Sequence, residues 1–195
     1  RERIRPVYFV SVIVFIVPVY LLLSVARSHN VEYLNGIFEM KYNLPIFISQ
    51  PYIYIANNYD NLDTLIKELP KHSFGLKGLF PLWALTGIKF IYPKIVDFPI
   101  FVNKTELTTV TLFYDAFYDF GIAGVAVFSA ALGCIGYFFE KLIRSTRHAT
   151  FYIIYAQVFI YLALSFFTTW FSNPATWFYF IVTMSIFFIC EQKGR

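Results

Sequence analysis

Charge and cysteine are both scarce in this sequence, and their scarcity excludes several classes of protein. Asp, Glu, Lys and Arg make up 14% of the 195 residues, whereas soluble globular domains have about 25%. The only two cysteines, Cys134 and Cys190, both fall in apolar stretches and show neither metal-binding spacing nor a disulfide framework. The shortage of charge indicates a chain that needs a lipid bilayer as its solvent.

The common catalytic signatures are also missing. The sequence has no phosphate-binding glycine loop, no Gly-x-Ser-x-Gly motif, no His-Glu-x-x-His motif and no Asp-x-Asp pair. We therefore expect no metal and no cofactor. The formal net charge of +4 does not indicate a nucleic-acid partner, because half of the basic residues lie in short segments beside apolar stretches.

The chain is rich in apolar residues: 58% of its residues are hydrophobic and 22% are aromatic. Four apolar segments predict membrane-spanning helices at about residues 7–25, 120–139, 150–170 and 175–190. We expect Ser172 or Asn173 to cap the last of them before Pro174. Gln157 in the third is expected to make an interhelical hydrogen bond. The predicted fold is an all-α integral membrane protein with about four transmembrane helices.

The positions of the basic residues predict the topology. Arg1, Arg3 and Arg5 precede the first span, residues 141–147 carry three more, and Lys193 and Arg195 end the chain. By the positive-inside rule both termini are expected in the cytoplasm, and residues 26–115 form a large extracytoplasmic loop. The chain begins beside a hydrophobic segment without Met. We expect one membrane domain over residues 1–195, as the C-terminal part of a longer polytopic protein.

The large loop should contain short helices lying at the membrane interface. Residues 61–69 have helical spacing of leucine and isoleucine, with Asp60 or Asn61 as the expected cap and Pro70 as the stop. Residues 44–56 and 82–92 are apolar but too short to span a bilayer, which predicts interfacial or re-entrant segments. Thr105 is expected to cap a helix that starts at Glu106 and continues into the second span.

Several charged residues of this loop have both a structural and a functional interpretation. Arg27, just beyond the first span, is either an interfacial arginine or a contact for a diphosphate. His72, like His29, is either an ordinary loop residue or a base for an acceptor hydroxyl. Asp115 and Asp119 lie four apart on one helix face, where they either stabilise the helix N-terminus or bind sugar and act as acid or base.

Two further patterns point to packing or recognition. Asn57, Asn58 and Tyr52, which follow Gln50 closely, form a Tyr/Asn-rich patch typical either of turns or of carbohydrate recognition. A run of small residues from Gly121 to Gly136 should let another helix approach closely.

The order of these motifs resembles the C-terminal half of the oligosaccharide repeat unit polymerases, the Wzy-type enzymes of O-antigen and capsular polysaccharide synthesis. The resemblance covers about residues 7–190. It is carried by Arg27 after a membrane helix, Gln50-Pro51-Tyr52 leading into Asn57–Asn61, His72–Gly75, Asn103-Lys104-Thr105, and Tyr118–Gly124 at the start of a span.

Membership would imply a metal-independent glycosyltransferase of the GT-C type in the bacterial cytoplasmic membrane. Such an enzyme transfers a glycan from undecaprenyl diphosphate onto another lipid-linked repeat unit at the outer face. The partners would be that lipid-linked oligosaccharide, membrane lipids, and a chain-length regulator and flippase. The implied catalytic residues are Arg27, His72 and Asp119. The implied substrate-binding residues are Gln50, Tyr52, Asn57, Asn58, Lys77, Asn103, Thr105 and Asp115.

Two alternatives stay open at this point. One is a lipid-linked oligosaccharide flippase or another transporter component, although the predicted spans hold few polar residues of the kind that transporters place near the bilayer midplane. The other is an inactive fragment of a split polymerase gene.

Overall fold

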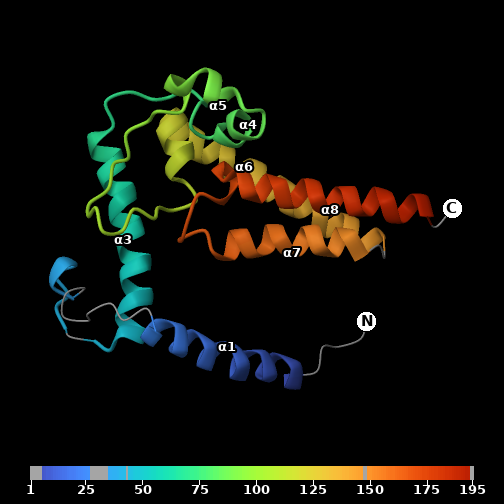
Figure 1. Ribbon diagram of the computed structural model, residues 1–195, viewed down its shortest axis with the longest axis horizontal. Coiled ribbons are helices and arrows are strands. Elements are labelled where there is room, and N and C mark those ends of the chain that lie inside the picture. The colour runs from blue at the N-terminus through green and yellow to red at the C-terminus, as the bar shows by residue number, and fades with distance from the viewer. Residues whose placement is uncertain (1–5, 27–34, 43, 147–148, 194–195) are drawn as a thin grey trace. The chain divides into compact units, whose positions relative to one another are not determined.

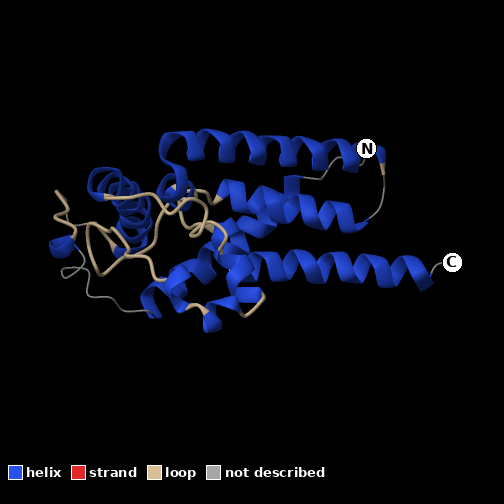
Figure 2. Ribbon diagram, turned by 90° about the horizontal axis from the view of Figure 1, so that it is seen from above, coloured by secondary structure: helices blue, strands red, loops and turns tan. Residues whose placement is uncertain are grey.

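The computed structural model describes residues 6–26, 35–42, 44–146 and 149–193, and over these residues the chain is all helical, with no strand (Figures 1 and 2). The chain divides into two compact units, residues 1–56 and 57–195. The predicted helical class is confirmed for the described residues.

The first unit contains α1 (Pro6–Ala26) and the beginning of α3 (Ile46–Glu68). Helix α1 coincides with the predicted span 7–25 and contains Pro18. The Tyr20 hydroxyl donates a hydrogen bond to the Phe47 carbonyl over 3.3 Å, which links α1 to the start of α3. Apolar side chains of α1 are well exposed, including Phe15 at 73%.

Helix α3 corrects two expectations for the large loop. The apolar segment 44–56 and the predicted helix 61–69 belong to one continuous helix that ends at Glu68, just before Pro70. Asp60 and Asn61 therefore lie inside the helix and cap nothing. The stop at Pro70 is confirmed, because proline disfavours helical geometry in the residue before it.

The asparagines of α3 explain why the helix continues through them. Asn57 Nδ2 donates to the Leu107 carbonyl over 2.9 Å, and Asn61 Nδ2 donates to the Leu107 and Thr109 carbonyls over 3.1 and 2.8 Å. Asn61 Oδ1 accepts from the Asn103 backbone N–H. Because these amides pair with another segment, they do not compete with the helix for its own backbone groups.

Three long helices of the second unit follow the predicted spans with shifted ends. They are α6 (Tyr114–Ser145), α7 (Ala149–Ala163) and α8 (Pro174–Lys193), and α7 packs against both α6 and α8 (Figure 1). Among the described helices, α6 is the one long and apolar enough to cross a membrane, while α7 and α8 are shorter apolar helices.

Two helix boundaries differ from the predictions. Helix α6 begins at Tyr114 rather than at Glu106. Residues 108–111 are β-branched, which disfavours a helix, and the Leu107 and Thr109 carbonyls accept hydrogen bonds from α3. Helix α7 ends at Ala163, short of residue 170. There the Leu112 backbone N–H donates to the Ser165 carbonyl over 2.7 Å, and Asn58 Nδ2 donates to the Phe166 carbonyl over 2.6 Å.

Two smaller predictions about α7 and α8 are confirmed. Asn173 is the cap of α8, since its Oδ1 accepts from the Ala175 backbone N–H over 2.9 Å. Gln157 Nε2 of α7 donates to Thr183 Oγ1 of α8 over 3.2 Å, which is the expected interhelical hydrogen bond.

Short helices cover the N-terminal end of α8. Helix α4 (Phe80–Leu85) packs on α8, and α5 (Ile88–Ile91) and the 3-10 helix η1 (Pro93–Ile95) follow it. A second 3-10 helix, η2 (Trp170–Ser172), precedes α8 and contacts α4. The apolar stretch 82–92 thus forms two short helices.

The core of the second unit lies where the end of α3 meets the start of α6. Leu65, Tyr114 and Tyr118 are 0%, 1% and 3% exposed and form one buried cluster. Phe98 and Phe101 pack against it from the segment before α6. This packing fixes the first two turns of α6, where the two aspartates lie.

Helix α6 is kinked at Gly121, which has a φ of 63° and a ψ of −148°. Only glycine adopts this backbone conformation at little cost in free energy. The kink brings the Ala116 carbonyl so close to Gly124 that a Cβ there would lie 2.3 Å from it. At Gly124 the close neighbour is thus the backbone of α6 itself and not the other helix that the sequence predicted. A Cβ added to Gly133 or Gly136 would meet no atom within 4 Å outside the adjacent turns of its own helix, among the described residues.

Candidate binding cavity

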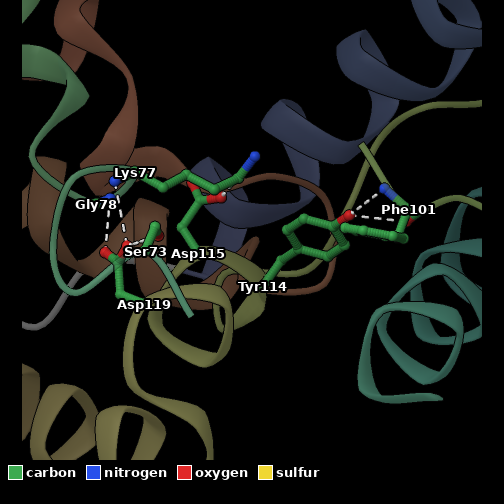
Figure 3. Close-up of polar contacts among 7 residues, drawn as sticks. All are labelled: Ser73, Lys77, Gly78, Phe101, Tyr114, Asp115 and Asp119. Carbon is green, nitrogen blue, oxygen red and sulfur yellow. Dashed lines mark hydrogen bonds and ion pairs between the residues drawn. The ribbon is translucent and has the colours of Figure 1, made fainter. Parts of the chain in front are cut away.

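Asp119 anchors the loop that precedes α4 to the beginning of α6 (Figure 3). Its carboxylate accepts hydrogen bonds from the Ser73 hydroxyl, from the Lys77 backbone N–H over 3.1 Å and from the Gly78 backbone N–H over 2.7 Å. The Asp119 carbonyl also accepts from the Phe74 backbone N–H over 3.1 Å. Asp119 is 3% exposed, so its carboxylate is largely shielded from solvent.

Two glycines make this anchoring possible. A Cβ on Gly78 would lie 2.6 Å from Asp119 Oδ2, so only glycine lets the backbone approach the carboxylate this closely. A Cβ on Gly121 would lie 3.2 Å from the His72 ring. His72 Nδ1 lies 3.2 Å from the Tyr118 carbonyl, so this histidine packs against the kink of α6.

The same loop directs the Lys77 side chain toward the first turn of α6 (Figure 3). Lys77 Nζ lies 3.9 Å from Asp115 Oδ1 and 4.5 Å from the centre of the Tyr118 ring. Burial lowers the pKa of the Lys77 ammonium, and the carboxylates of Asp115 and Asp119 oppose that shift. Thr169 and Ser172 line the same cavity as the Asp115 carboxylate.

These groups line a cavity of about 350 Å³, which we call the Lys77 cavity. Its polar lining comes from Lys77, Asp115, Thr108, Thr169 and Ser172. Aromatic lining comes from Phe80, Phe98 and Tyr114. The Tyr114 hydroxyl donates to the Phe101 carbonyl over 2.7 Å and accepts from its N–H over 2.8 Å, so this ring is held rigidly (Figure 3). The volume is in the range of small-molecule sites.

An apolar groove of about 580 Å³ adjoins the cavity. It runs along α6 past Ala123, Val127 and Ala131, with Trp177 of α8 also in its lining. Ser172 lines both the groove and the Lys77 cavity. A polar cavity and an apolar groove therefore meet at the N-terminal part of α6.

The structure brings four of the predicted site residues into one region: Lys77 and Asp115 line the cavity, Asp119 holds the loop that carries Lys77, and His72 packs against the same part of α6. Because the loop donates hydrogen bonds to both oxygens of the Asp119 carboxylate, the geometry favours a positioning role for Asp119, which also lines the apolar groove. Asp115 is the carboxylate that faces the cavity.

The other predicted site residues lie elsewhere. Asn57 and Asn58 are 2% and 0% exposed, and their amides hydrogen-bond carbonyls of other segments, so these contacts are structural. Asn103 and Thr105 are exposed on the segment before α6. Gln50 and Tyr52 belong to the first unit, where Gln50 is buried and Tyr52 is exposed. Arg27, like His29, lies outside the described residues.

Sequence reasoning missed Thr169, Ser172 and the aromatic lining of the cavity. Ser172 carried a signal, because it lies in the polar turn before Pro174, but that signal indicated a helix cap. Phe80, Phe98 and Tyr114 had no signal among the many aromatic residues of the chain. Their role depends on the tertiary structure, which local sequence patterns do not determine.

The described residues contain no group of three or more His, Cys, Asp or Glu side chains that could hold a metal ion. Comparison with protein-family models, with curated proteins and with solved structures finds no match to this chain.

Proposed function

We propose that this chain is part of a multi-pass protein of the bacterial cytoplasmic membrane that polymerises lipid-linked oligosaccharides at the outer face. In this proposal α1, α6, α7 and α8 are the membrane-spanning helices, and the chain between α1 and α6 lies outside the cytoplasm. The exposed apolar side chains of these helices, such as Ile122 at 81% and Val127 at 71%, support contact with lipid.

The observation that carries the proposal is the position of the Lys77 cavity. A cavity with an ammonium group, a carboxylate and three hydroxyl side chains lies at the N-terminal end of α6, the membrane-length helix. In the proposed topology that end meets the outer surface of the membrane. A glycan on a membrane-borne carrier is the kind of substrate that must be handled at such a place.

The proposed reaction transfers a glycan between two lipid-linked units. The oxygen of an acceptor hydroxyl forms a bond to the anomeric carbon of the donor glycan. The bond between that carbon and the carrier diphosphate breaks, and its electron pair leaves with undecaprenyl diphosphate. The proton of the acceptor hydroxyl passes to a carboxylate. Since the loop donates hydrogen bonds to both oxygens of Asp119, and Asp115 lines the Lys77 cavity, Asp115 is the carboxylate that we assign to this step.

Substitution of Lys77 tests the proposal in cells. The full-length protein with Lys77→Met is expressed in a strain that lacks the native gene, and the polysaccharide ladder is resolved by electrophoresis. The variant removes the Lys77 ammonium group as a hydrogen-bond donor to the substrate. Loss of a hydrogen bond to a charged group costs about 2 kcal/mol, so the amount of long-chain polymer should fall by more than about tenfold. Lys71→Met is the matched control, because Lys71 is exposed in the same loop and should leave the ladder unchanged.

The location of unpolymerised substrate separates polymerisation from transport. A polymerase variant should accumulate single lipid-linked units at the outer face, where an added lectin or glycosidase can reach them. A flippase variant would retain them at the inner face. A normal ladder from Lys77→Met at wild-type protein level would defeat the proposal. Arg27→Ala remains a separate prediction, with loss of long chains as the expected result.

A further inference from the structure

We propose that the Lys77 cavity binds an uncharged sugar ring of the acceptor glycan, and that the carrier diphosphate binds elsewhere. This assignment rests on the proposed function and specifies which part of the substrate occupies the cavity. The resemblance implies only that Lys77 binds substrate, and this assignment makes its ligand a sugar rather than the diphosphate. Charge, lining chemistry and the geometry around Asp115 each support it.

The charge of the cavity disfavours a diphosphate. Lys77 is the one cation among the described residues that line it, and its ammonium already faces the Asp115 carboxylate at 3.9 Å. The Asp119 carboxylate also acts electrostatically on Lys77. One ammonium near two carboxylates leaves no surplus positive charge for an anion, and recognition of a phosphate group relies on such a surplus.

The lining of the cavity matches the two faces of a sugar ring. Phe80, Phe98 and Tyr114 offer aromatic surface for the apolar C–H face of a pyranose. Thr108, Thr169 and Ser172 offer hydroxyl groups that both donate and accept hydrogen bonds. A mostly apolar wall with a few placed polar groups is typical of a site that binds a small neutral ligand.

The pair formed by Lys77 and Asp115 has the spacing to hold a ligand hydroxyl. Their separation of 3.9 Å is longer than a direct hydrogen bond between nitrogen and oxygen, which has a length of about 2.7–3.2 Å. A sugar hydroxyl beside both groups would donate to the carboxylate and accept from the ammonium. The carboxylate is thus placed to take the proton of that hydroxyl when its oxygen attacks the donor.

Binding measurements on the purified full-length protein in lipid nanodiscs test the assignment. The first probe is the repeat-unit oligosaccharide released by hydrolysis of the host polysaccharide, and the second is undecaprenyl diphosphate without sugar. We expect Asp115→Asn to lower affinity for the oligosaccharide by about tenfold or more. The same variant should leave the affinity for undecaprenyl diphosphate within about twofold of wild type.

A pair of threonine variants distinguishes the loss of a binding contact from the loss of the fold. Thr108→Val removes one hydroxyl from the cavity lining and should weaken oligosaccharide binding about threefold or more. Thr86→Val has the same chemistry at an exposed position outside that lining and should have no effect. Both valine variants should unfold at the wild-type temperature.

The outcomes that overturn the assignment are distinct. If Asp115→Asn and Thr108→Val change only the affinity for undecaprenyl diphosphate, the cavity is a diphosphate site. If the wild-type protein does not bind the oligosaccharide, or if both variants bind it normally, the cavity is not a sugar site. If binding depends on Thr108 while cells with Lys77→Met still make long polymer, the polymerase proposal fails and the sugar site stands.

Discussion

Asp119 shows how a single carboxylate in a hydrophobic chain can be structural rather than catalytic. Its position at the top of a membrane-length helix made it a candidate acid or base. In the structure its two oxygens accept from one hydroxyl and two backbone N–H groups of the loop at residues 73–78. Burial of a charge is tolerated when its hydrogen bonds are satisfied in this way. Asp115, one turn earlier, lines the Lys77 cavity together with Thr169 and Ser172.

We predict that Asp119→Ala destabilises the second unit by about 3 kcal/mol, because it leaves buried backbone N–H groups without their acceptor. Asp97→Ala is the matched control, since Asp97 is exposed and its loss should change stability by less than about 0.5 kcal/mol. Chemical unfolding of the protein in detergent micelles measures both. Equal stabilities for the two variants would show that the loop does not depend on this carboxylate.

At the scale of elements, the kink of α6 connects the apolar helix to the cavity. Gly121 adopts a conformation that costs other residues about 1–3 kcal/mol, and its missing side chain leaves room for His72. The turns before the kink carry Asp115 and Asp119, while the residues after it carry no charge as far as Phe139, and apolar side chains such as Ile122 and Val127 are exposed. The uncharged part from Ile122 to Phe139 is about 27 Å long at 1.5 Å per residue, close to the roughly 30 Å of a bilayer's hydrocarbon core.

Replacement of Gly121 with alanine should therefore destabilise the protein by about 2 kcal/mol, through the strained backbone and the contact with His72. Gly133→Ala in the same helix should be neutral or stabilising by up to about 1 kcal/mol, because Gly133 is exposed and has open space around it. Thermal unfolding of the two variants in the same detergent compares them directly. A Gly121→Ala protein as stable as Gly133→Ala would contradict the role assigned to the kink.

The elements that the sequence predicted well are those with a local cause. Helices α1 and α8 follow from continuous apolar runs, and the start of α8 follows from Asn173 and Pro174. Helix α3 was predicted in two pieces because its asparagines are typical of caps and turns when they are read locally. Their partners, such as the Leu107 carbonyl, lie far along the chain. The false start at Glu106 has the same origin, since residues 107–112 pair with α3 instead of forming a helix.

The candidate site was predictable in part for the same reason. Asp115 and Asp119 stood out because carboxylates are rare at the end of an apolar helix. Lys77 was only one of several basic residues in a long loop until the loop was placed against α6. Thr169 and Ser172 enter the cavity from the turn between α7 and α8, so their part in it depends on tertiary structure alone.

At the scale of the whole molecule, the proposed topology rests on the distribution of charge and on exposed apolar surface. Lys94 lies in the 3-10 helix between α5 and α6, in the part assigned to the outside, and Arg144 lies in the last turn of α6, in the part assigned to the cytoplasm. Both side chains are exposed, although Arg144 pairs with Glu140 in the same helix. Lys94 and Arg144 therefore report on opposite ends of the proposed span.

Labelling of single cysteines in intact cells tests this topology. In a background with Cys134→Ala and Cys190→Ala, a membrane-impermeant maleimide should label Lys94→Cys without permeabilisation. Arg144→Cys should react only after the membrane is opened, because the positive-inside rule places that end in the cytoplasm. Both cysteines should react equally in permeabilised cells, which controls for local accessibility.

Labelling of both from outside would show that α6 does not cross the membrane. Labelling of Arg144→Cys alone would reverse the orientation and put the Lys77 cavity out of reach of any substrate at the outer face.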